Sequence, residues 1–190
     1  LKMVMKFGVK NEWINHYEWD IKYPASGQPK SLEVLSANNH RKILDYVRQN
    51  FSFMGLGIYI SLSTGLRIGE ICALKWNDID VIDGTIAVRR TIERIYLTEG
   101  EKKRTQLVTG TPKTINSCRE IPMGKELLAM VKPIKKVVNG DFYVLTNEKK
   151  PTEPRTYRNF YNRFMKELGI PKLKYHGLRH SFATRCIEAG

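Results

Sequence analysis

The sequence has few cysteines, and they form no recognisable pattern. Cys72, Cys118 and Cys186 are the three in 190 residues, and they are widely spaced. This spacing gives neither a disulfide framework nor the closely spaced ligands of a structural zinc site. It suits a reducing compartment, so we expect a cytoplasmic protein in which all three are small core residues.

Long apolar runs and acidic residues are also scarce. The longest apolar run, residues 51–62, is interrupted by Gly and Ser and is shorter than the ~20 residues that a membrane-spanning helix needs, so we expect a buried helix. Asp and Glu number 19 against 32 Lys and Arg, a formal net charge of +13. This excess favours polyanionic partners, nucleic acid first, although solubility alone is the simpler interpretation.

The composition divides the chain into two parts. Residues 1–15 carry apolar side chains at helical spacing, and a Pro-, Gly- and Ser-rich stretch follows at 22–31. We therefore expect residues 1–30 to be the tail of a preceding domain plus a linker, and residues 31–190 to form one well-buried domain. Because the sequence begins with Leu rather than Met, we also expect it to be a piece of a longer protein.

Hydrophobic periodicity in residues 31–190 predicts mostly helices. Helices are expected at 36–49, 51–62, 66–76, 125–131, 155–168 and from 176 onward. Asp83-Gly84 predicts a hairpin turn between two β-branched runs, and residues 117–123 predict a third strand. The polar stretch 97–116 is either a flexible connection or one that touches DNA. The whole predicts a mainly helical α+β fold with a small three-stranded antiparallel sheet.

The helix expected at 155–168 is strongly amphipathic. Its apolar stripe, which we expect to pack in the core, consists of Tyr157, Phe160, Tyr161, Phe164 and Leu168. The opposite face carries the predicted DNA-binding residues, which are Arg155, Arg158, Arg163 and Lys166. Contacts from such residues to phosphates would give affinity and register rather than sequence recognition.

Two pairs of residues could carry chemistry on a phosphodiester. Arg67 and Glu70 lie three residues apart at the start of one predicted helix, and His176 and Arg179 do so in another. Two planar, always charged guanidinium groups could clamp one phosphate and stabilise charge that develops on it. The histidine could donate to the same phosphate, and Lys113 could protonate a leaving oxygen. Taken alone, Arg67 with Glu70 is a surface ion pair of small value.

A metal site is the alternative use of the histidines. His176 and His180 have the four-residue spacing of metal ligands, but Gly177 stands where a zinc protease has its glutamate, and no nearby carboxylate or Cys completes a site. We therefore expect no metal and no cofactor, and we interpret His180 as a packed helix residue that supports the site.

Three motifs resemble those of a known family. "TGLRIGEICALKWNDID" and "HGLRHSFAT" resemble the two arginine boxes of the tyrosine recombinases, the integrases of phages and conjugative transposons. "TPKTINSCREIPM" resembles the lysine-bearing β-hairpin between those boxes, and the three occur in the family's order between about Ser31 and Gly190. The resemblance implies a role for each matching residue: Arg67 and Arg179 as the catalytic arginines, Glu70 orienting the first, Lys113 as general acid and His176 as the histidine of the second box.

The resemblance also implies a reaction. In that family a tyrosine hydroxyl attacks a DNA phosphodiester, which gives a 3′-phosphotyrosyl link and a free 5′-hydroxyl, and the strands are rejoined without metal or ATP. The partners that the resemblance implies are double-stranded DNA, three further copies in a homotetramer, and DNA-bending accessory proteins. The family's nucleophile follows the second box, so we expect it outside these residues and expect this piece to bind DNA without cutting it. Tyr161 and Tyr175 are poor substitutes, since one lies in an apolar stripe and the other precedes the box.

Three rival functions remain open at this stage. A type IB topoisomerase uses a similar phosphate clamp, but the compact spacing and the wording of the boxes favour a recombinase. A non-catalytic DNA-binding regulator could keep the fold without turnover, which the retention of all four basic candidates argues against. A purely structural or protein-interaction role is the weakest alternative.

Overall fold

The computed structural model describes residues 2–15, 33–97, 104–111 and 118–189. The chain divides into two compact units, Leu1–Ser31 and Leu32–Gly190. Within the first unit, the described helix is α1 (Lys2–Lys10), and Phe7 packs edge to face against Trp13 at 5.5 Å between ring centroids. The linker predicted at 22–31 lies outside the described residues.

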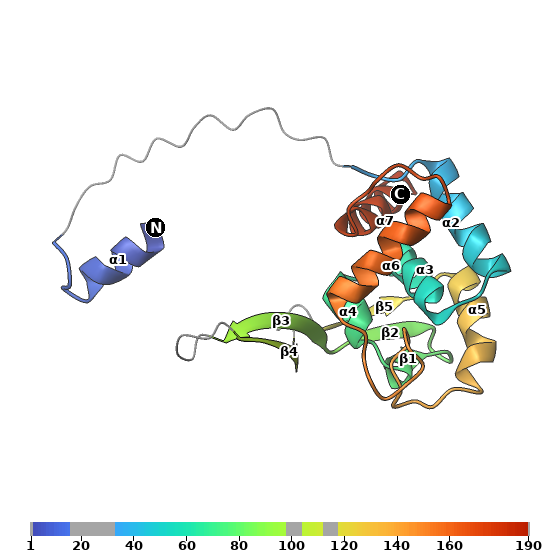
Figure 1. The fold of residues 1–190 in the computed structure, drawn as a ribbon, viewed down its shortest axis with the longest axis horizontal. Helices are drawn as coiled ribbons and strands as arrows, with labels where there is room; N and C mark the ends of the chain where they lie inside the picture. Colours follow the sequence, from blue (N-terminus) through green and yellow to red (C-terminus); the bar gives the residue numbers. More distant parts are fainter. Residues whose placement is uncertain (1, 16–32, 98–103, 112–117, 190) are drawn as a thin grey trace. The chain divides into compact units, whose positions relative to one another are not determined.

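The second unit carries the other elements (Figure 1). Its helices are α2 (Ala37–Gln49), α3 (Phe53–Thr64), α4 (Ile68–Ala73), the 3-10 turn η1 (Trp76–Asp78), α5 (Lys125–Lys135), α6 (Pro154–Glu167) and α7 (His176–Glu188). Its strands are β1 (Ile79–Asp80), β2 (Thr85–Val88), β3 (Thr91–Leu97), β4 (Arg104–Gly110) and β5 (Arg119–Pro122). The predicted mainly helical α+β fold is confirmed.

The predicted three-stranded antiparallel sheet is present, in the order β1-β2-β5. β1 and β2 flank the predicted turn, where Gly84 has a φ of +67° that favours glycine. Ile86 pairs with Ile121 and Val88 with Arg119, so the N-terminal end of β5 is fixed against the end of β2. This register determines where the Arg119 side chain emerges from the sheet.

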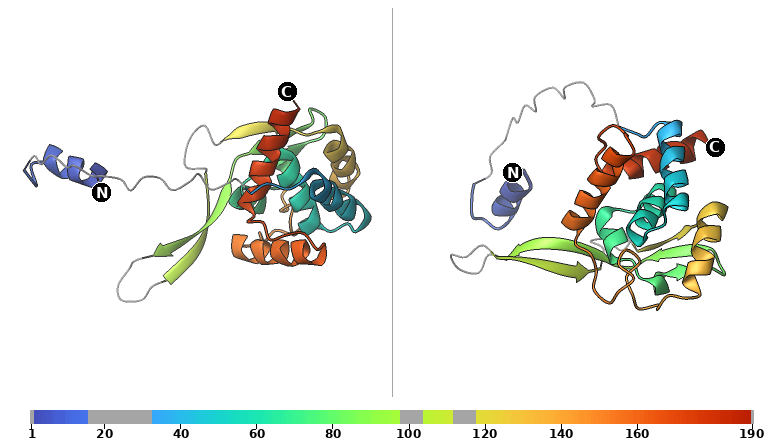
Figure 2. Two further views of the ribbon diagram at one scale, coloured as in Figure 1. Left: turned by 90° about the horizontal axis from the view of Figure 1, so that it is seen from above. Right: turned by 45° about the vertical axis from the view of Figure 1, so that its right-hand side comes forward.

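A second sheet is formed by β3 and β4, which lie between β2 and β5 in the sequence. Its register runs from Thr91 opposite Gly110 to Leu97 opposite Arg104. The polar stretch predicted as a connection therefore holds a strand, β4, and pairs with the segment before it. The views of Figures 1 and 2 show this hairpin extending away from the three-stranded sheet.

The core is built around α3, which is apolar on all sides. Leu56, Ile58 and Ile60 are fully buried, and the helix begins at Ser52, whose Oγ accepts a hydrogen bond from the Gly55 N–H at 3.0 Å. The helix ends at Gly65, which adopts the left-handed conformation with φ +65°. The predicted buried helix is confirmed, shifted by two residues.

The helix expected at 155–168 is also confirmed as α6. Tyr157, Tyr161, Phe164 and Leu168 are buried, and Phe160 is half-buried against the core. α5 is longer than predicted because it continues to Lys135 through Pro133. None of the helices in the described ranges is long and apolar enough to cross a membrane.

The prediction that all three cysteines are core residues is wrong for two of them. Cys72 is buried in α4, whereas Cys118 and Cys186 are exposed. Cys118 immediately precedes β5, and Cys186 stands near the end of α7 beside the exposed Ile187. The spacing of the cysteines could not separate these environments.

Candidate active site

Arg67 occupies the residue before α4, a helix of six residues that starts later than predicted. Its backbone is extended, and the Glu70 carboxylate returns to accept the Arg67 backbone N–H at 2.8 Å. This contact caps the first turn, as the glutamate of a capping box does. Arg67 Nη1 also donates to Glu70 Oε1 at 3.0 Å. The Arg67 guanidinium, half exposed, is thus held by a carboxylate on its own helix.

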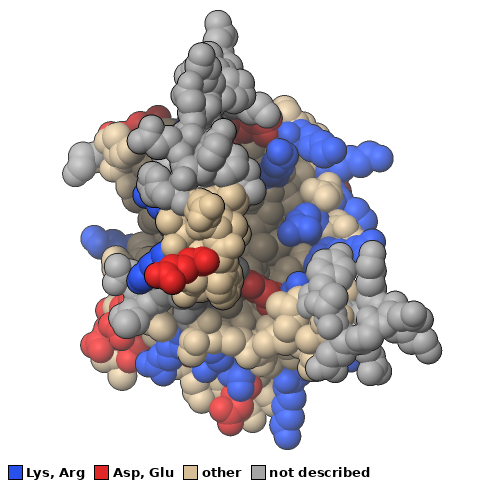
Figure 3. Space-filling view, turned by 90° about the vertical axis from the view of Figure 1, so that its left-hand side faces the viewer, with Lys and Arg blue, Asp and Glu red and all other residues tan. Residues whose placement is uncertain are grey.

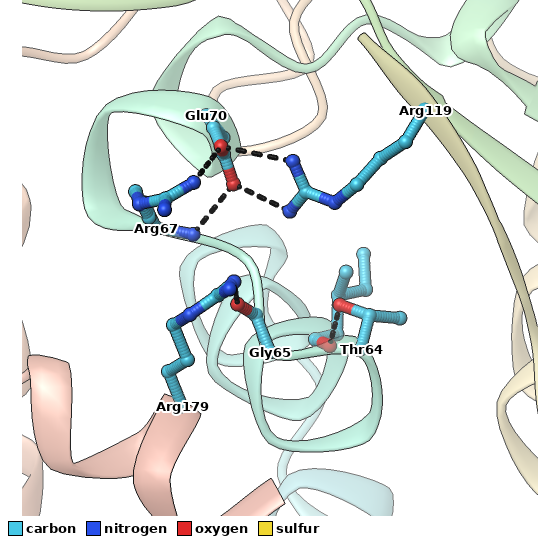
Figure 4. Close-up of polar contacts among 7 residues, drawn as sticks. Thr64, Gly65, Arg67, Glu70, Arg119 and Arg179 are labelled. Atoms are coloured by element: carbon cyan, nitrogen blue, oxygen red, sulfur yellow. Dashed lines mark hydrogen bonds and ion pairs between the residues drawn. The ribbon is translucent and has the colours of Figure 1, made fainter. Parts of the chain in front are cut away.

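Arg119 contacts the same carboxylate from the sheet (Figure 4). Its Nη1 and Nη2 donate to the two Glu70 oxygens at 3.1 and 2.9 Å, a bidentate arrangement. Burial alone would raise the pKa of the Glu70 carboxyl, but the hydrogen bonds from Arg119 and Arg67 outweigh burial and hold that pKa below its ordinary value. Glu70 therefore stays ionised although its side chain is only 4% exposed.

Close packing fixes the position of α4 against β3. A Cβ atom at Gly69 would lie 2.5 Å from Thr91 Oγ1 and 2.8 Å from the Ile92 carbonyl oxygen. Neither distance is tolerable for a side chain, and the second neighbour is backbone. Gly69 therefore allows the start of α4, with Arg67, to lie directly on the hairpin strand.

Arg179 reaches the same region from α7. Its Nη1 donates to the Gly65 carbonyl oxygen at 2.7 Å, at the C-terminal end of α3, where the helix dipole favours a cation. Burial lowers the pKa of the Arg179 guanidinium, and the charges of Arg67 and Arg119 lower it further, whereas Glu70 opposes them. Three guanidinium groups thus surround one carboxylate, which leaves positive charge for an anion.

His176 is the exposed first residue of α7. Its ring lies edge to face with that of His180, with 4.7 Å between centroids. Partial desolvation lowers the pKa of the His176 imidazole, and so do His180, Arg179 and Arg67. This shift favours the uncharged imidazole, which can both donate and accept a hydrogen bond.

A pocket of about 480 Å³ adjoins these residues. Arg67 and His176 line it together with Arg158 of α6 and with Lys172 and Lys174, which precede α7. Figure 3 shows the face that points to the left in Figure 1. Lys and Arg side chains gather on this face. One residue of the predicted DNA-binding helix face, Arg158, thus lines the same pocket as Arg67 and His176.

The other residues of that helix face are exposed but differently placed. Lys166 lines a neighbouring pocket with Lys172, whereas Arg163 lines one shared with Tyr46 and Glu167. Arg155 is exposed in the first turn of α6. The four residues predicted to bind DNA therefore do not form a single row.

One predicted site residue, Lys113, lies outside the described residues. The tyrosines weighed as substitute nucleophiles are buried: Tyr161 is fully inaccessible, and Tyr175 is 6% exposed, with its hydroxyl 2.6 Å from Ser61 Oγ. Burial raises the pKa of both phenols far above the ordinary value. Neither hydroxyl is available to attack a phosphate from solvent.

Arg119 is the site residue that sequence reasoning missed. The signal was present, because side chains two apart in a strand share a face, and Arg119 shares one with the half-buried apolar Ile121. A charged residue on the apolar face of a strand indicates a buried partner of opposite charge. That partner is Glu70.

Comparison with known proteins gives a family match. The sequence model of the phage integrase family matches residues 33–190. The tyrosine recombinase XerC-like protein of Caldanaerobacter subterraneus subsp. tengcongensis is 30% identical over 147 residues, which cover 69% of this chain and 38% of that protein. The ICEBs1 integrase of Bacillus subtilis is 25% identical over 172 residues, 85% of this chain and 45% of the integrase. The chain thus spans less than half the length of these two relatives.

Solved structures share the fold. The integrase of transposon Tn1549, in a complex with transposon right end DNA, superposes with a TM-score of 0.74 at 21% identity, covering all of this chain and 64% of that one. XerA recombinase gives a TM-score of 0.57 at 22% identity, covering 83% and 51%. At these identities the likeness extends to the fold alone.

Proposed function

The chain belongs to the phage integrase family, and we propose that it forms the catalytic domain of a site-specific tyrosine recombinase that integrates or excises a mobile element. One observation carries this proposal: Arg67 and Arg179, far apart in the sequence, lie within electrostatic reach of each other and of His176. Two guanidinium groups with a neighbouring imidazole supply the positive charge and the hydrogen-bond donors that a phosphodiester requires.

Each residue has a role in the proposed strand cleavage. Arg67 and Arg179 would bind the non-bridging phosphate oxygens and stabilise the charge that grows on them in the transition state. His176 would donate to the same phosphate, with His180 supporting its ring, and Glu70 would orient Arg67. A tyrosine hydroxyl would pass its proton to the unprotonated ring nitrogen of His176 and form a bond to phosphorus while the bond from phosphorus to the 5′-oxygen breaks. Lys113 would donate a proton from its own ammonium group to that departing oxygen. The phosphotyrosyl ester conserves the energy of the broken phosphodiester bond for rejoining, so no metal or ATP is needed.

We propose that the nucleophilic tyrosine comes from outside residues 1–190. The burial of Tyr161 and Tyr175 supports this proposal, because each would need the core to open before its hydroxyl could reach a phosphate. Residues 1–30 would be the tail of a preceding core-binding domain plus a linker, and residues 31–190 the catalytic domain.

The proposed partner is duplex DNA, bound by a homotetramer in the bacterial cytoplasm with DNA-bending accessory proteins. The net charge of +13 supports a polyanionic partner, and structures of the Tn1549 integrase contain transposon DNA. On this chain the DNA-binding set would be Arg155, Arg158, Arg163 and Lys166. Arg158, which shares the pocket with Arg67, would contact the strand closest to the site of cleavage.

The test is covalent capture of DNA. The full-length protein is incubated with nicked duplexes that span the junction of its own element, and adducts that survive SDS are scored by gel. We expect an adduct through a tyrosine, and none with Arg67→Ala. Tight binding to the same duplex without an adduct would instead indicate a non-catalytic regulator, and relaxation of supercoiled plasmids without such a junction would indicate a topoisomerase.

A further inference from the structure

We infer that Arg119 is a positioning residue for strand cleavage, which orients the Arg67 guanidinium through the Glu70 carboxylate. The inference rests on the proposed function, since it concerns how the first arginine of the clamp is held. Arg119 itself need not touch DNA.

The hydrogen bonds of Glu70 show why a second arginine is required. Its Oε2 accepts from the Arg67 backbone N–H and from Arg119 Nη2, and its Oε1 accepts from Arg67 Nη1 and Arg119 Nη1. Arg67 contacts each oxygen once, through two different parts of the residue. Arg119 contacts both oxygens through one rigid group, so it is the partner that sets the plane of the carboxylate.

The two arginines differ in how firmly they are held. The Arg119 side chain is 25% exposed, and Arg119 itself is the first residue of β5 and pairs with Val88 of β2. The Arg67 side chain is 51% exposed and precedes a helix of only six residues. Arg119, held by the sheet, therefore orients the Glu70 carboxylate. The carboxylate in turn orients Arg67, which lines the pocket.

The single negative charge of Glu70 offsets only part of the positive charge of the cluster. Arg67, Arg119 and Arg179 repel one another, and the electrostatic influence of the first two on Arg179 lowers the pKa of that guanidinium. Glu70 opposes this effect on Arg179. An amine at position 119 would keep the charge but could not bind both oxygens in one plane.

This contrast gives the test, performed in the full-length protein. Arg119→Lys keeps the charge, Arg119→Gln removes it, and Arg48→Lys is the matched control, because Arg48 also bridges two elements through a carboxylate, Glu126 of α5. Single-turnover cleavage of a nicked duplex is measured at saturating DNA, and the dissociation constant is measured separately. We expect Arg119→Lys to slow cleavage ~10–100-fold, as a small misplacement of a catalytic group does. DNA affinity should change less than about threefold, and Arg48→Lys should cleave like the wild type.

A double-mutant cycle with Glu70→Gln establishes the route. If Arg119 acts through Glu70, then adding Arg119→Gln to Glu70→Gln costs no further cleavage rate. Independent, additive losses would overturn the inference, as would an Arg119→Lys variant that regains the wild-type rate at low temperature, which would indicate reduced folding stability alone.

A crystal structure of the Arg119→Gln variant tests the inference without any reaction. We expect the Glu70 carboxylate rotated and the Arg67 guanidinium displaced, and an unmoved Arg67 would contradict the inference. If instead the wild-type protein forms no adduct with DNA while Arg67 is displaced in the variant, the proposed function fails and the positioning role of Arg119 stands.

Discussion

The two basic regions of this molecule, the arginines around Glu70 and the exposed face of α6, hold their charges in different ways. At Glu70 each guanidinium is fixed by hydrogen bonds to a carboxylate or a carbonyl. On α6, Arg155, Arg158 and Arg163 are exposed, and within the described residues no hydrogen bond holds their ends. Fixed cations lose little entropy and need no reorganisation when charge develops, whereas free cations adapt to a flexible polyanion. This difference supports the proposal that the first region acts in catalysis and the second in DNA affinity.

The largest effect should follow from removing a fixed cation. Arg179→Ala in the full-length protein takes away a donor held by the Gly65 carbonyl and should lower the single-turnover cleavage rate at least ~10²–10³-fold, the cost of one such donor elsewhere. Binding should weaken only a few-fold, because one of many phosphate contacts is lost. Quench-flow cleavage and filter binding measure the two separately. Equal losses of cleavage rate and of DNA affinity would contradict the distinction between the cluster around Glu70 and the α6 face.

Removing the shared carboxylate should affect both stability and rate. Glu70→Gln leaves Arg119 facing a neutral amide, and we expect the free energy of unfolding at pH 7 to fall by about 2 kcal/mol, less than for a fully buried pair because Arg67 is half exposed. The pKa of Glu70 is lowered in the folded protein, so its contribution is complete above the ordinary value of 4.5 and is lost as the pH falls below it. Urea unfolding of both proteins between pH 3.5 and 7 should show the difference shrinking toward acid. A difference independent of pH would mean that the charge of Glu70 contributes nothing.

Neutralising the exposed cations should produce a smaller change, and it should affect DNA affinity rather than the cleavage rate. Arg158→Gln should weaken DNA binding about 3–10-fold and reduce the slope of log affinity against log salt by about 1, with the rate at saturating DNA unchanged. Arg163→Gln should have less effect, because Arg163 lines a separate pocket with Tyr46 and Glu167. A loss of rate at saturation in the Arg158 variant would place that residue with the fixed cations.

The smallest effect concerns a single proton. His176 should titrate below its ordinary pKa of 6.5, since desolvation and the charges of His180, Arg179 and Arg67 all disfavour the imidazolium. Arg67→Ala removes one of these charges and should raise the pKa of His176, which nuclear magnetic resonance of the imidazole can follow. An unchanged or lower pKa in the variant would separate His176 from the arginines.

Local chemistry made much of the fold predictable, and long-range contacts account for what was missed. Helices α2, α3 and α6 lie within two residues of the ranges that periodicity predicts, and local residues bound two of them, because Ser36 and Ser52 cap α2 and α3 and Gly65 ends α3. β4 was not predicted, because its apolar residues Leu107 and Val108 are adjacent rather than alternating with polar ones, and its pairing with β3 becomes evident only when both strands are in place. The two exposed cysteines were misjudged because exposure depends on neighbours far away in the sequence.

The site divides along the same line. Arg67 and Glu70 were recognisable because their contact spans three residues, and the spacing of His176 and Arg179 indicated a shared helix face. The bond from Arg179 to Gly65 and the one from Arg119 to Glu70 join distant segments, and no spacing encodes them. The sequence therefore indicated the candidate groups, and the structure shows the contacts that hold the described ones in place.

The most direct test of this account is a structure of the full-length protein bound to duplex DNA. We predict that one phosphodiester lies between the guanidinium groups of Arg67 and Arg179 and that Glu70 stays bound to Arg119. The α6 cations should contact other phosphates. Arginines bound to two different phosphates, or a Glu70–Arg119 pair broken by DNA, would contradict the claim that this cluster is a preformed clamp.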